Sequence, residues 1–208
     1  MEKDIVLEVK NLSVSFYTDQ RKNTAIRDVS LTARRGKTLC VVGESGCGKS
    51  VSASAIMRLL PELSRIENGE IMYYGREEPI RLDKLDPDGD LIRQIRGADI
   101  AMIFQDPMTA LNPVYTVGYQ ISEMLLEHNK GMKKSEAMEK SVLLLKAMGI
   151  PLPEQRVNEY PHQFSGGMRQ RAMIAMAMAC NPKLLLADEP TTALDVTVQA
   201  QIFELMAD

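Results

Sequence analysis

Residues 43–50 have the sequence GESGCGKS, and this spacing of glycines with Lys49 and Ser50 can hold a chain of phosphates. In such a loop, backbone N–H groups and the start of the following helix converge on the phosphate oxygens. We expect Lys49 to reach the β- and γ-phosphates, and the Ser50 hydroxyl to bind Mg²⁺. The segment therefore predicts a nucleoside triphosphate site.

The glycines of this loop have a physical reason to be there. Without a Cβ they permit backbone torsions and close approaches that other residues would block. Cys47 stands near a helix start, which favours a thiolate, but a tolerated small residue explains it more simply. The residues predicted to contact the nucleotide here are Gly43, Glu44, Ser45, Gly46, Cys47, Gly48, Lys49, Ser50 and Val51.

A second set of residues with reactive side chains lies at the carboxyl end of the apolar segment LLLA, residues 184–187. These residues are Asp188 and Glu189. In an open α/β sheet that edge lies beside the phosphate loop. Asp188 is predicted to hold Mg²⁺ through water, and Glu189 to be the general base that polarises the attacking water. A strand followed by Asp-Glu is common, so the assignment depends on its combination with the phosphate loop.

Two further segments complete the predicted chemistry. Gln105 ends an apolar segment, and its amide can reach Mg²⁺ and the attacking water, although a glutamine in a surface loop would look the same. Ser165, Gly166 and Gly167 stand at a predicted helix start, where N–H groups and a hydroxyl form another anion site. A second chain, turned head to tail, could bring this site onto the γ-phosphate.

These groups must be positioned by strands and helices. Residues 38–42 (TLCVV) are apolar and β-branched, so they predict a buried strand, and 51–60 predict the helix after the loop. Buried strands that alternate with helices predict an α/β fold with a mostly parallel sheet, an N-terminal antiparallel part and an inserted helical lobe. Further strands are predicted near 5–9, 12–17, 24–32, 71–74, 100–104 and 184–187, and further helices near 91–96, 117–127, 134–148, 166–180 and 196–206.

The composition is that of a globular protein, with 208 residues, 45% hydrophobic and 25% charged, and a formal net charge of −3. No basic stripe is evident, which argues against nucleic acid as the main ligand. The three cysteines match neither a zinc site nor a disulfide framework, so a reducing cytosol is the simpler interpretation. No apolar run approaches the roughly 18 residues that span a bilayer, so a membrane role is expected to come through a partner.

The chain carries five motifs in a characteristic order. They are the phosphate loop (43–50), Gln105, SGGMRQR (165–171), LLLADEP (184–190) and TTALD (191–195). Together they resemble the nucleotide-binding domain of an ATP-binding cassette (ABC) transporter, and the resemblance covers essentially the whole chain. IFQDPMTALNP (103–113) is typical of the ATPases of oligopeptide and dipeptide importers and their nickel relatives, and FSGGM resembles the first of their two ATPase subunits.

By this resemblance, two cassettes enclose two ATP molecules, and each site takes the phosphate loop of one chain and the Ser-Gly-Gly of the other. Asp195 would lie in the loop that crosses the dimer interface, and residues 106–120 with Gln105 would contact a membrane subunit. An aromatic side chain near the N-terminus would stack on adenine. Phe16 fits this place best and Tyr17 is the alternative, while a core role suits Phe16 equally well.

The resemblance also implies a P-loop NTPase fold, with an ATP-binding core of residues 1–105 plus 181–208 and a helical subdomain of residues 106–180. The activity it implies is ATP hydrolysis that drives import of peptides or related small solutes. The implied partners are a second ATPase subunit in a heterodimer, two integral membrane permease subunits and, indirectly, a solute-binding protein. The implied location is peripheral, at the cytoplasmic face of the bacterial plasma membrane.

The alternative function is that of a soluble ABC ATPase acting on nucleic acid or ribosomes. Such proteins carry long coiled-coil insertions, zinc-type cysteine pairs or a second cassette, and this sequence has none of them. Import is therefore the preferred hypothesis.

The chain departs from the family's pattern at two places. Met168 replaces the usual glutamine of the signature and removes a side-chain donor. The family also places a histidine some tens of residues beyond the catalytic glutamate, whereas His128 and His162 both precede Glu189. We therefore expect a C-terminally truncated domain, and expect residues 1–208 alone to hydrolyse ATP slowly, if at all.

Overall fold

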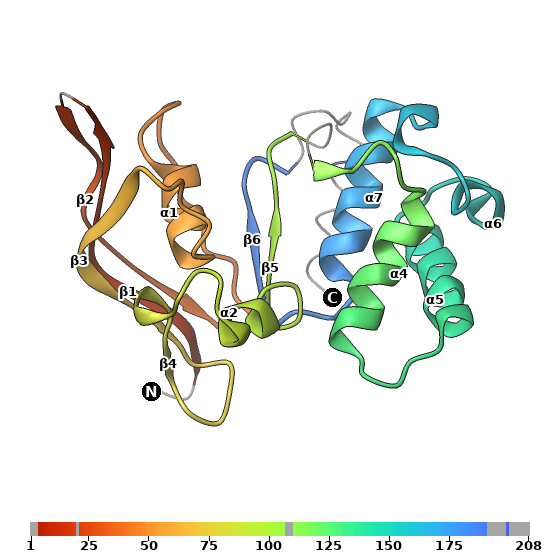
Figure 1. Ribbon diagram of the computed structural model, residues 1–208, viewed down its shortest axis with the longest axis horizontal. Coiled ribbons are helices and arrows are strands. Elements are labelled where there is room, and N and C mark those ends of the chain that lie inside the picture. Colours follow the sequence, from red (N-terminus) through yellow and green to blue (C-terminus); the bar gives the residue numbers. More distant parts are fainter. Residues whose placement is uncertain (1–3, 20, 107–109, 191–198, 200–208) are drawn as a thin grey trace. The chain divides into compact units, whose positions relative to one another are not determined.

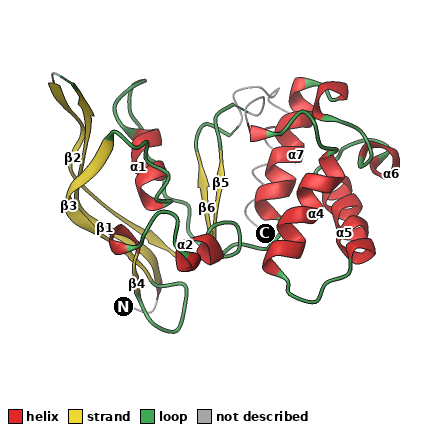
Figure 2. Cartoon of the chain, viewed as in Figure 1, coloured by secondary structure: helices red, strands yellow, loops and turns green. Residues whose placement is uncertain are grey.

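The computed structural model describes residues 4–19, 21–106, 110–190 and 199 (Figure 1). The chain divides into two compact units, Met1–Arg96 and Gly97–Asp208. The first unit contains most of the strands and the second most of the helices (Figure 2). The last predicted helix, near 196–206, falls outside the described residues.

The first unit is built on an antiparallel sheet in the order β2-β1-β3-β4. Its long strands β1 and β2 form a hairpin, and β3 pairs with the other edge of β1. Apolar side chains recur along β1 and are buried, among them Val9, Leu12 and Val14, which is why this strand lies in the core of the unit. The bounds are β1 (Ile5–Thr18), β2 (Arg21–Arg34), β3 (Ser64–Tyr73) and β4 (Ile80–Arg81).

In the described part of the first unit, three short helices accompany the sheet. They are α1 (Lys49–Ile56), the 3₁₀ helix η2 (Leu82–Lys84) and α2 (Asp90–Ile95). Ala55 and Ile56 at the end of α1 are buried, as are Ile92 and Ile95 of α2, so these helices are held by their apolar residues.

The second unit combines a parallel pair of strands with a group of helices. Strand β5 (Ile100–Ile103) pairs with β6 (Leu184–Ala187), residue Ile100 lying opposite Leu184. The segments between these strands form α4 (Val117–His128), α5 (Lys134–Ala147), α6 (Pro153–Arg156), the 3₁₀ helix η3 (Pro161–Gln163) and α7 (Gly166–Met178).

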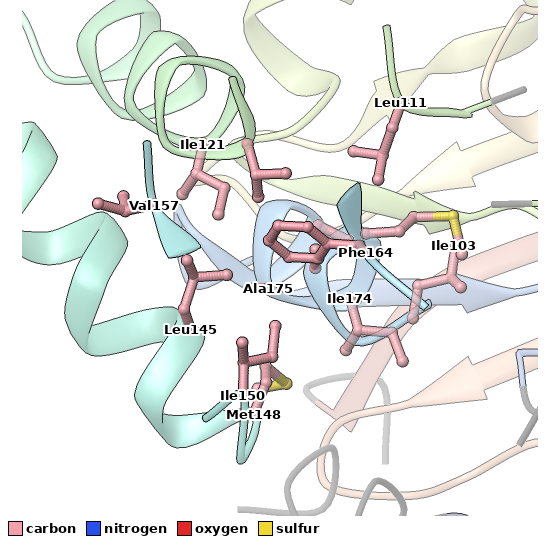
Figure 3. Packing of buried hydrophobic residues seen from close by; sticks show 14 of the residues in the cluster. Ile103, Leu111, Ile121, Leu145, Met148, Ile150, Val157, Phe164, Ile174 and Ala175 are labelled. Carbon is pink, nitrogen blue, oxygen red and sulfur yellow. The ribbon is translucent and has the colours of Figure 1, made fainter. Parts of the chain in front are cut away.

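One apolar cluster joins the strands and helices of the second unit. Figure 3 shows part of it around Phe164, with Ile121 from α4, Leu145 from α5 and Ile174 from α7. Ile103 of β5 belongs to the same cluster, so the helices and the strand pair share one core. This shared packing fixes the polar residues that follow β5 and β6 relative to α7.

Most of the predicted elements are confirmed, including β6 at the predicted residues 184–187 and the helix that begins after Ser165. The buried strand predicted at 38–42 is wrong, because these residues form no strand and Val42 is 92% exposed. A parallel strand exists only through hydrogen bonds to its neighbours, and 38–42 pairs with none of the described strands. The division into a core of 1–105 plus 181–208 and a subdomain of 106–180 stays a prediction.

Candidate nucleotide-binding site

The phosphate loop lies in the first unit and leads directly into α1. Gly48 is the N-cap of this helix and has a left-handed φ of 101°, which residues with a Cβ rarely adopt. A Cβ at Gly48 would also lie 2.9 Å from the carbonyl oxygen of Ala25 in β2. The loop therefore needs glycine at this position for two separate reasons, and it approaches the sheet closely here.

The Lys49 side chain folds back over the loop that precedes it. Its Nζ donates hydrogen bonds to the carbonyl oxygens of Gly43, at 2.7 Å, and Glu44, at 2.9 Å. The ammonium is thus held against the carbonyl oxygens of the loop, while the first N–H groups of α1 lack partners within the helix. A cation and several N–H donors gathered in one loop fit an anionic phosphate chain.

The other end of α1 is fastened by an arginine. Arg96 donates from Nε to the carbonyl oxygen of Met57, at 2.8 Å, and from Nη2 to that of Arg58, at 2.6 Å. A cation at the C-terminal end of a helix also interacts favourably with the helix dipole. Burial lowers the pKa of Arg96, but an arginine stays charged. The helix behind the phosphate loop is therefore anchored at its far end.

In the second unit, strand register explains why Gln105 and Glu189 meet. Ile103 and Ala187 are opposite each other at the ends of β5 and β6, and the two polar residues each follow two positions later. The Nε2 of Gln105 donates to Oε2 of Glu189 at 2.9 Å. The pairing extends beyond the strands, because the N–H of Asp188 donates to the carbonyl oxygen of Ile103 at 3.0 Å.

The backbone at Glu189 has an uncommon conformation. Its φ is 48°, in the left-handed region, although the residue carries a Cβ. Such conformations cost free energy and persist where the surrounding structure holds them, often at functional sites. Glu189 is exposed and Asp188 is half-buried. The carboxylate is thus accessible to water, as a general base must be.

The start of α7 forms a second group of donors in this unit. Ser165 is the N-cap, and its Oγ accepts a hydrogen bond from the N–H of Met168 at 3.3 Å. The hydroxyl can therefore still donate to a ligand. A Cβ at Gly166 would meet no atom within 4 Å, so there is open space beside the helix start. This start fits an anion, which stays a prediction for Ser165, Gly166 and Gly167.

Sequence reasoning missed three consecutive residues that hold α7 in place. Arg169 donates to the carbonyl oxygen of Phe164 at 2.7 Å, and Arg171 to that of Gly149 at 2.9 Å. Between them, Gln170 donates to the carbonyl oxygen of Pro190. Successive residues on a helix point about 100° apart, so the three side chains tie α7 to three different segments. The sequence signal was the polar triplet RQR inside an otherwise apolar helix.

The remaining predicted residues have varied placements. Ser50 and Val51 lie in the first turn of α1, and Asp195 lies outside the described residues.

Phe16 is half-buried in β1. The ring of Tyr17 is already engaged, since its hydroxyl donates to Glu67 and the Arg65 guanidinium lies 5.4 Å from the ring centroid. This favours Phe16 over Tyr17 as the adenine-stacking residue, which stays a prediction.

No group of three or more His, Cys, Asp and Glu side chains among the described residues could hold a metal ion. Proteins commonly bind Mg²⁺ through one or two side chains together with phosphate oxygens and water. The hydroxyl of Ser50 and the carboxylate of Asp188 are oxygen donors of the required kind.

The phosphate loop that opens α1, the antiparallel N-terminal sheet, and the parallel pair ending in Gln105 and Asp188-Glu189 define a class, the P-loop nucleotide-binding cassette. Residues 26–192 match the family model described as ABC transporter. The chain belongs to the ABC transporter family, which implies nucleotide binding, and the resemblance seen in the sequence is confirmed.

Curated relatives are similar over the whole chain. The chain is 51% identical to the dipeptide transport ATP-binding protein DppD of Lactococcus lactis subsp. cremoris, over 100% of this chain and 58% of that protein. It is 53% identical to the oligopeptide transport ATP-binding protein OppD of Bacillus subtilis, over 98% of this chain and 55% of that protein. The chain thus spans a little over half the length of these relatives.

Solved structures confirm the fold class. The ATP-binding cassette MJ0796, solved as a dimer in a post-hydrolysis state with ADP and Pi, has a TM-score of 0.83 and 30% identity over 96% of this chain and 81% of that one. CbiO1 of Clostridium perfringens, part of the transporter complex cbiONQ, has a TM-score of 0.73 and 26% identity over 99% of this chain and 73% of that one. In the part of the chain that the structure describes, no helix combines the length and apolarity needed to cross a bilayer.

Proposed function

We propose that the protein binds ATP with Mg²⁺ and hydrolyses it to drive the import of peptides or related small solutes through a membrane transporter. The observation that carries the proposal is the hydrogen bond between Gln105 and Glu189 at the ends of paired parallel strands. It gathers an amide and an accessible carboxylate at one edge, which is the pair that a hydrolytic water requires. The peptide transport names of relatives about 50% identical support the solute class.

Each residue has a proposed role in that reaction. The Lys49 ammonium binds the β- and γ-phosphates, for which it exchanges its present carbonyl partners, Gly43 and Glu44.

Bound Mg²⁺ would neutralise charge on the phosphates, with Ser50, Gln105 and Asp188 as its ligands or water partners. Glu189 accepts a proton from the attacking water, whose position Gln105 helps to define.

The proposed assembly is a head-to-tail pair of ATPase subunits, with a second ABC subunit as the partner. The dimeric state of the solved MJ0796 cassette supports this arrangement. Ser165, Gly166 and Gly167 would then serve the nucleotide of the partner, with Asp195 at the interface. Two permease subunits would hold the pair at the cytoplasmic face of the membrane, with a solute-binding protein acting outside it.

The experiment is transport by the protein assembled with its partner subunits in lipid vesicles. We expect ATP-dependent accumulation of a labelled peptide, and its loss when Lys49→Ala replaces the wild-type chain. ATP hydrolysis without uptake of any peptide in a panel of different lengths would refute the solute class. Absence of ATP binding by calorimetry would refute the proposal as a whole.

A further inference from the structure

Gln170 is a buried amide in the middle of an apolar helix face. It is 0% exposed, and Ala172, Met173 and Ile174, which follow it on α7, are buried as well. Burying an amide costs free energy unless its polar atoms are hydrogen-bonded. An aliphatic side chain would therefore be the simpler choice for stability at this position.

The amide uses only part of its hydrogen-bonding capacity. Its Nε2 donates to the carbonyl oxygen of Pro190, whereas its Oε1 is buried and meets no donor in the described part of the chain. A half-satisfied buried amide is a poor way to stabilise a core. Stability alone therefore does not explain why a glutamine with a hydrogen bond to Pro190 stands at this position.

The location of that bond suggests the reason. Pro190 directly follows Glu189, whose φ of 48° is uncommon for a residue with a Cβ and must be held by its surroundings. Gln105, two residues beyond β5, donates to the Glu189 side chain, and Gln170 of α7 donates to the carbonyl oxygen of Pro190, the next residue. The carboxylate is therefore restrained from two sides by two glutamines on different elements.

We propose that Gln170 is a positioning residue for the hydrolytic step. Its hydrogen bond to Pro190 keeps the Glu189 backbone in the conformation that aims the carboxylate at water. Because Gln170 lies five residues from Ser165 on the helix that Ser165 caps, the same bond joins the base to the second anion site. The inference rests on the proposed function, since it assigns Gln170 a part in the hydrolysis that Glu189 performs.

The test replaces the amide by an apolar side chain of similar size, as Gln170→Met and Gln170→Leu, in the protein assembled with its partner subunits. Both residues are strong helix formers, so α7 should be retained. The measurements are kcat and KM for ATP, nucleotide affinity by calorimetry, and the thermal unfolding midpoint. We expect kcat to fall between about tenfold and a hundredfold, as for a misplaced catalytic group, with KM and affinity within about twofold.

The thermal unfolding midpoint distinguishes a positioning role of Gln170 from a structural one. A positioning role predicts that both variants unfold at the wild-type temperature or above it, because an unpaired buried oxygen is removed. The matched control is Gln155→Met, since Gln155 is an exposed glutamine on α6 and should change neither rate nor stability. In a Glu189→Gln background, Gln170→Met should cause no further loss of the residual rate, because the residue acts through the base.

Several results would overturn the inference. These are a kcat within about twofold of wild type in either variant, a further loss in the Glu189→Gln background, or failure of both variants to fold. If the proposed ATP hydrolysis itself is wrong, the wild-type assembly would not hydrolyse ATP and Glu189→Gln would change nothing. The two failures are therefore distinguishable in the same set of measurements.

Discussion

Gln105 and Glu189 are 84 residues apart in the sequence, and their side chains are joined by a hydrogen bond of 2.9 Å. The contact follows from register, because Ile103 and Ala187 lie opposite each other and each polar residue comes two positions later. Parallel pairing therefore aligns two loops as well as two strands. An amide at one carboxyl end can orient a carboxylate at the other.

Glu189→Gln should remove the base and keep the binding of nucleotide. The side chain stays the same size, but it can no longer accept a proton, so turnover in the proposed transporter assembly should fall by about a hundredfold or more. ATP affinity should be retained, and the nucleotide-bound dimer should accumulate. Steady-state hydrolysis and calorimetry measure the two effects separately. Glu154→Gln, at an exposed glutamate of α6, is the matched control. Hydrolysis by the Glu189→Gln variant near the wild-type rate would exclude Glu189 as the base.

Lys49→Ala should weaken the binding of nucleotide itself. The Nζ now bonded to Gly43 and Glu44 is the group proposed to contact phosphate, and charge-assisted hydrogen bonds contribute about 1.5–3 kcal/mol. Affinity should therefore fall by roughly tenfold to a hundredfold. Calorimetric titration with a non-hydrolysable ATP analogue measures this, with the exposed Lys37→Ala as control. Unchanged affinity would rule out the assigned contact.

Gly48→Ala and Gly46→Ala should differ in their cost to stability. Both glycines have positive φ, which costs a residue with a Cβ about 1–2 kcal/mol. A Cβ at Gly46 would meet nothing within 4 Å, whereas at Gly48 it would lie 2.9 Å from the Ala25 carbonyl oxygen. Gly48→Ala should therefore lower the free energy of unfolding more than Gly46→Ala, as measured by urea titration. Equal losses would mean that β2 moves away from the added Cβ without a measurable cost in the free energy of unfolding.

Local patterns in the sequence were enough to predict most of the elements. The limits of β6 at 184–187 and the start of α7 after Ser165 are encoded by an apolar run and by a serine N-cap, both of which act over a few residues. The motifs also predicted roles for Gln105 and Glu189 individually. Their hydrogen bond depended on a strand register that the sequence does not specify by itself.

The failures of sequence reasoning have a common physical cause. The apolar run 38–42 has the composition of a strand, but strand formation depends on hydrogen-bond partners elsewhere in the chain. The polar triplet RQR marks Gln170 as unusual in an apolar helix, but it does not indicate the partner, because the bond to Pro190 spans 20 residues and forms only when α7 packs in the second unit. Side-chain bonds to distant backbone atoms follow from the fold and carry no periodic pattern.

Asp83 should make the stability of the first unit depend on pH in the acid range. Its carboxylate accepts hydrogen bonds from Arg81, at 2.7 Å and 3.1 Å, and from the N–H of Ile71, at 2.9 Å. Burial by itself would raise the pKa of Asp83, but these hydrogen bonds outweigh it and hold the pKa below its ordinary value. The charged form is therefore favoured by folding. This stabilisation is fully present above the unfolded pKa and is lost as the pH falls through the folded pKa.

The comparison of wild type with Asp83→Asn measures that contribution. At neutral pH the variant should have a lower free energy of unfolding, since an amide cannot replace the charged acceptor of Arg81 and also leaves an N–H₂ group to be satisfied. The difference should shrink as the pH is lowered below the pKa of the unfolded chain, because the wild-type carboxyl also becomes neutral. Urea titrations over this range provide the free energies, with Glu78→Gln at an exposed carboxylate as the control for the lost charge. A difference that stays constant into strong acid would contradict the assignment of the stabilisation to the charged carboxylate.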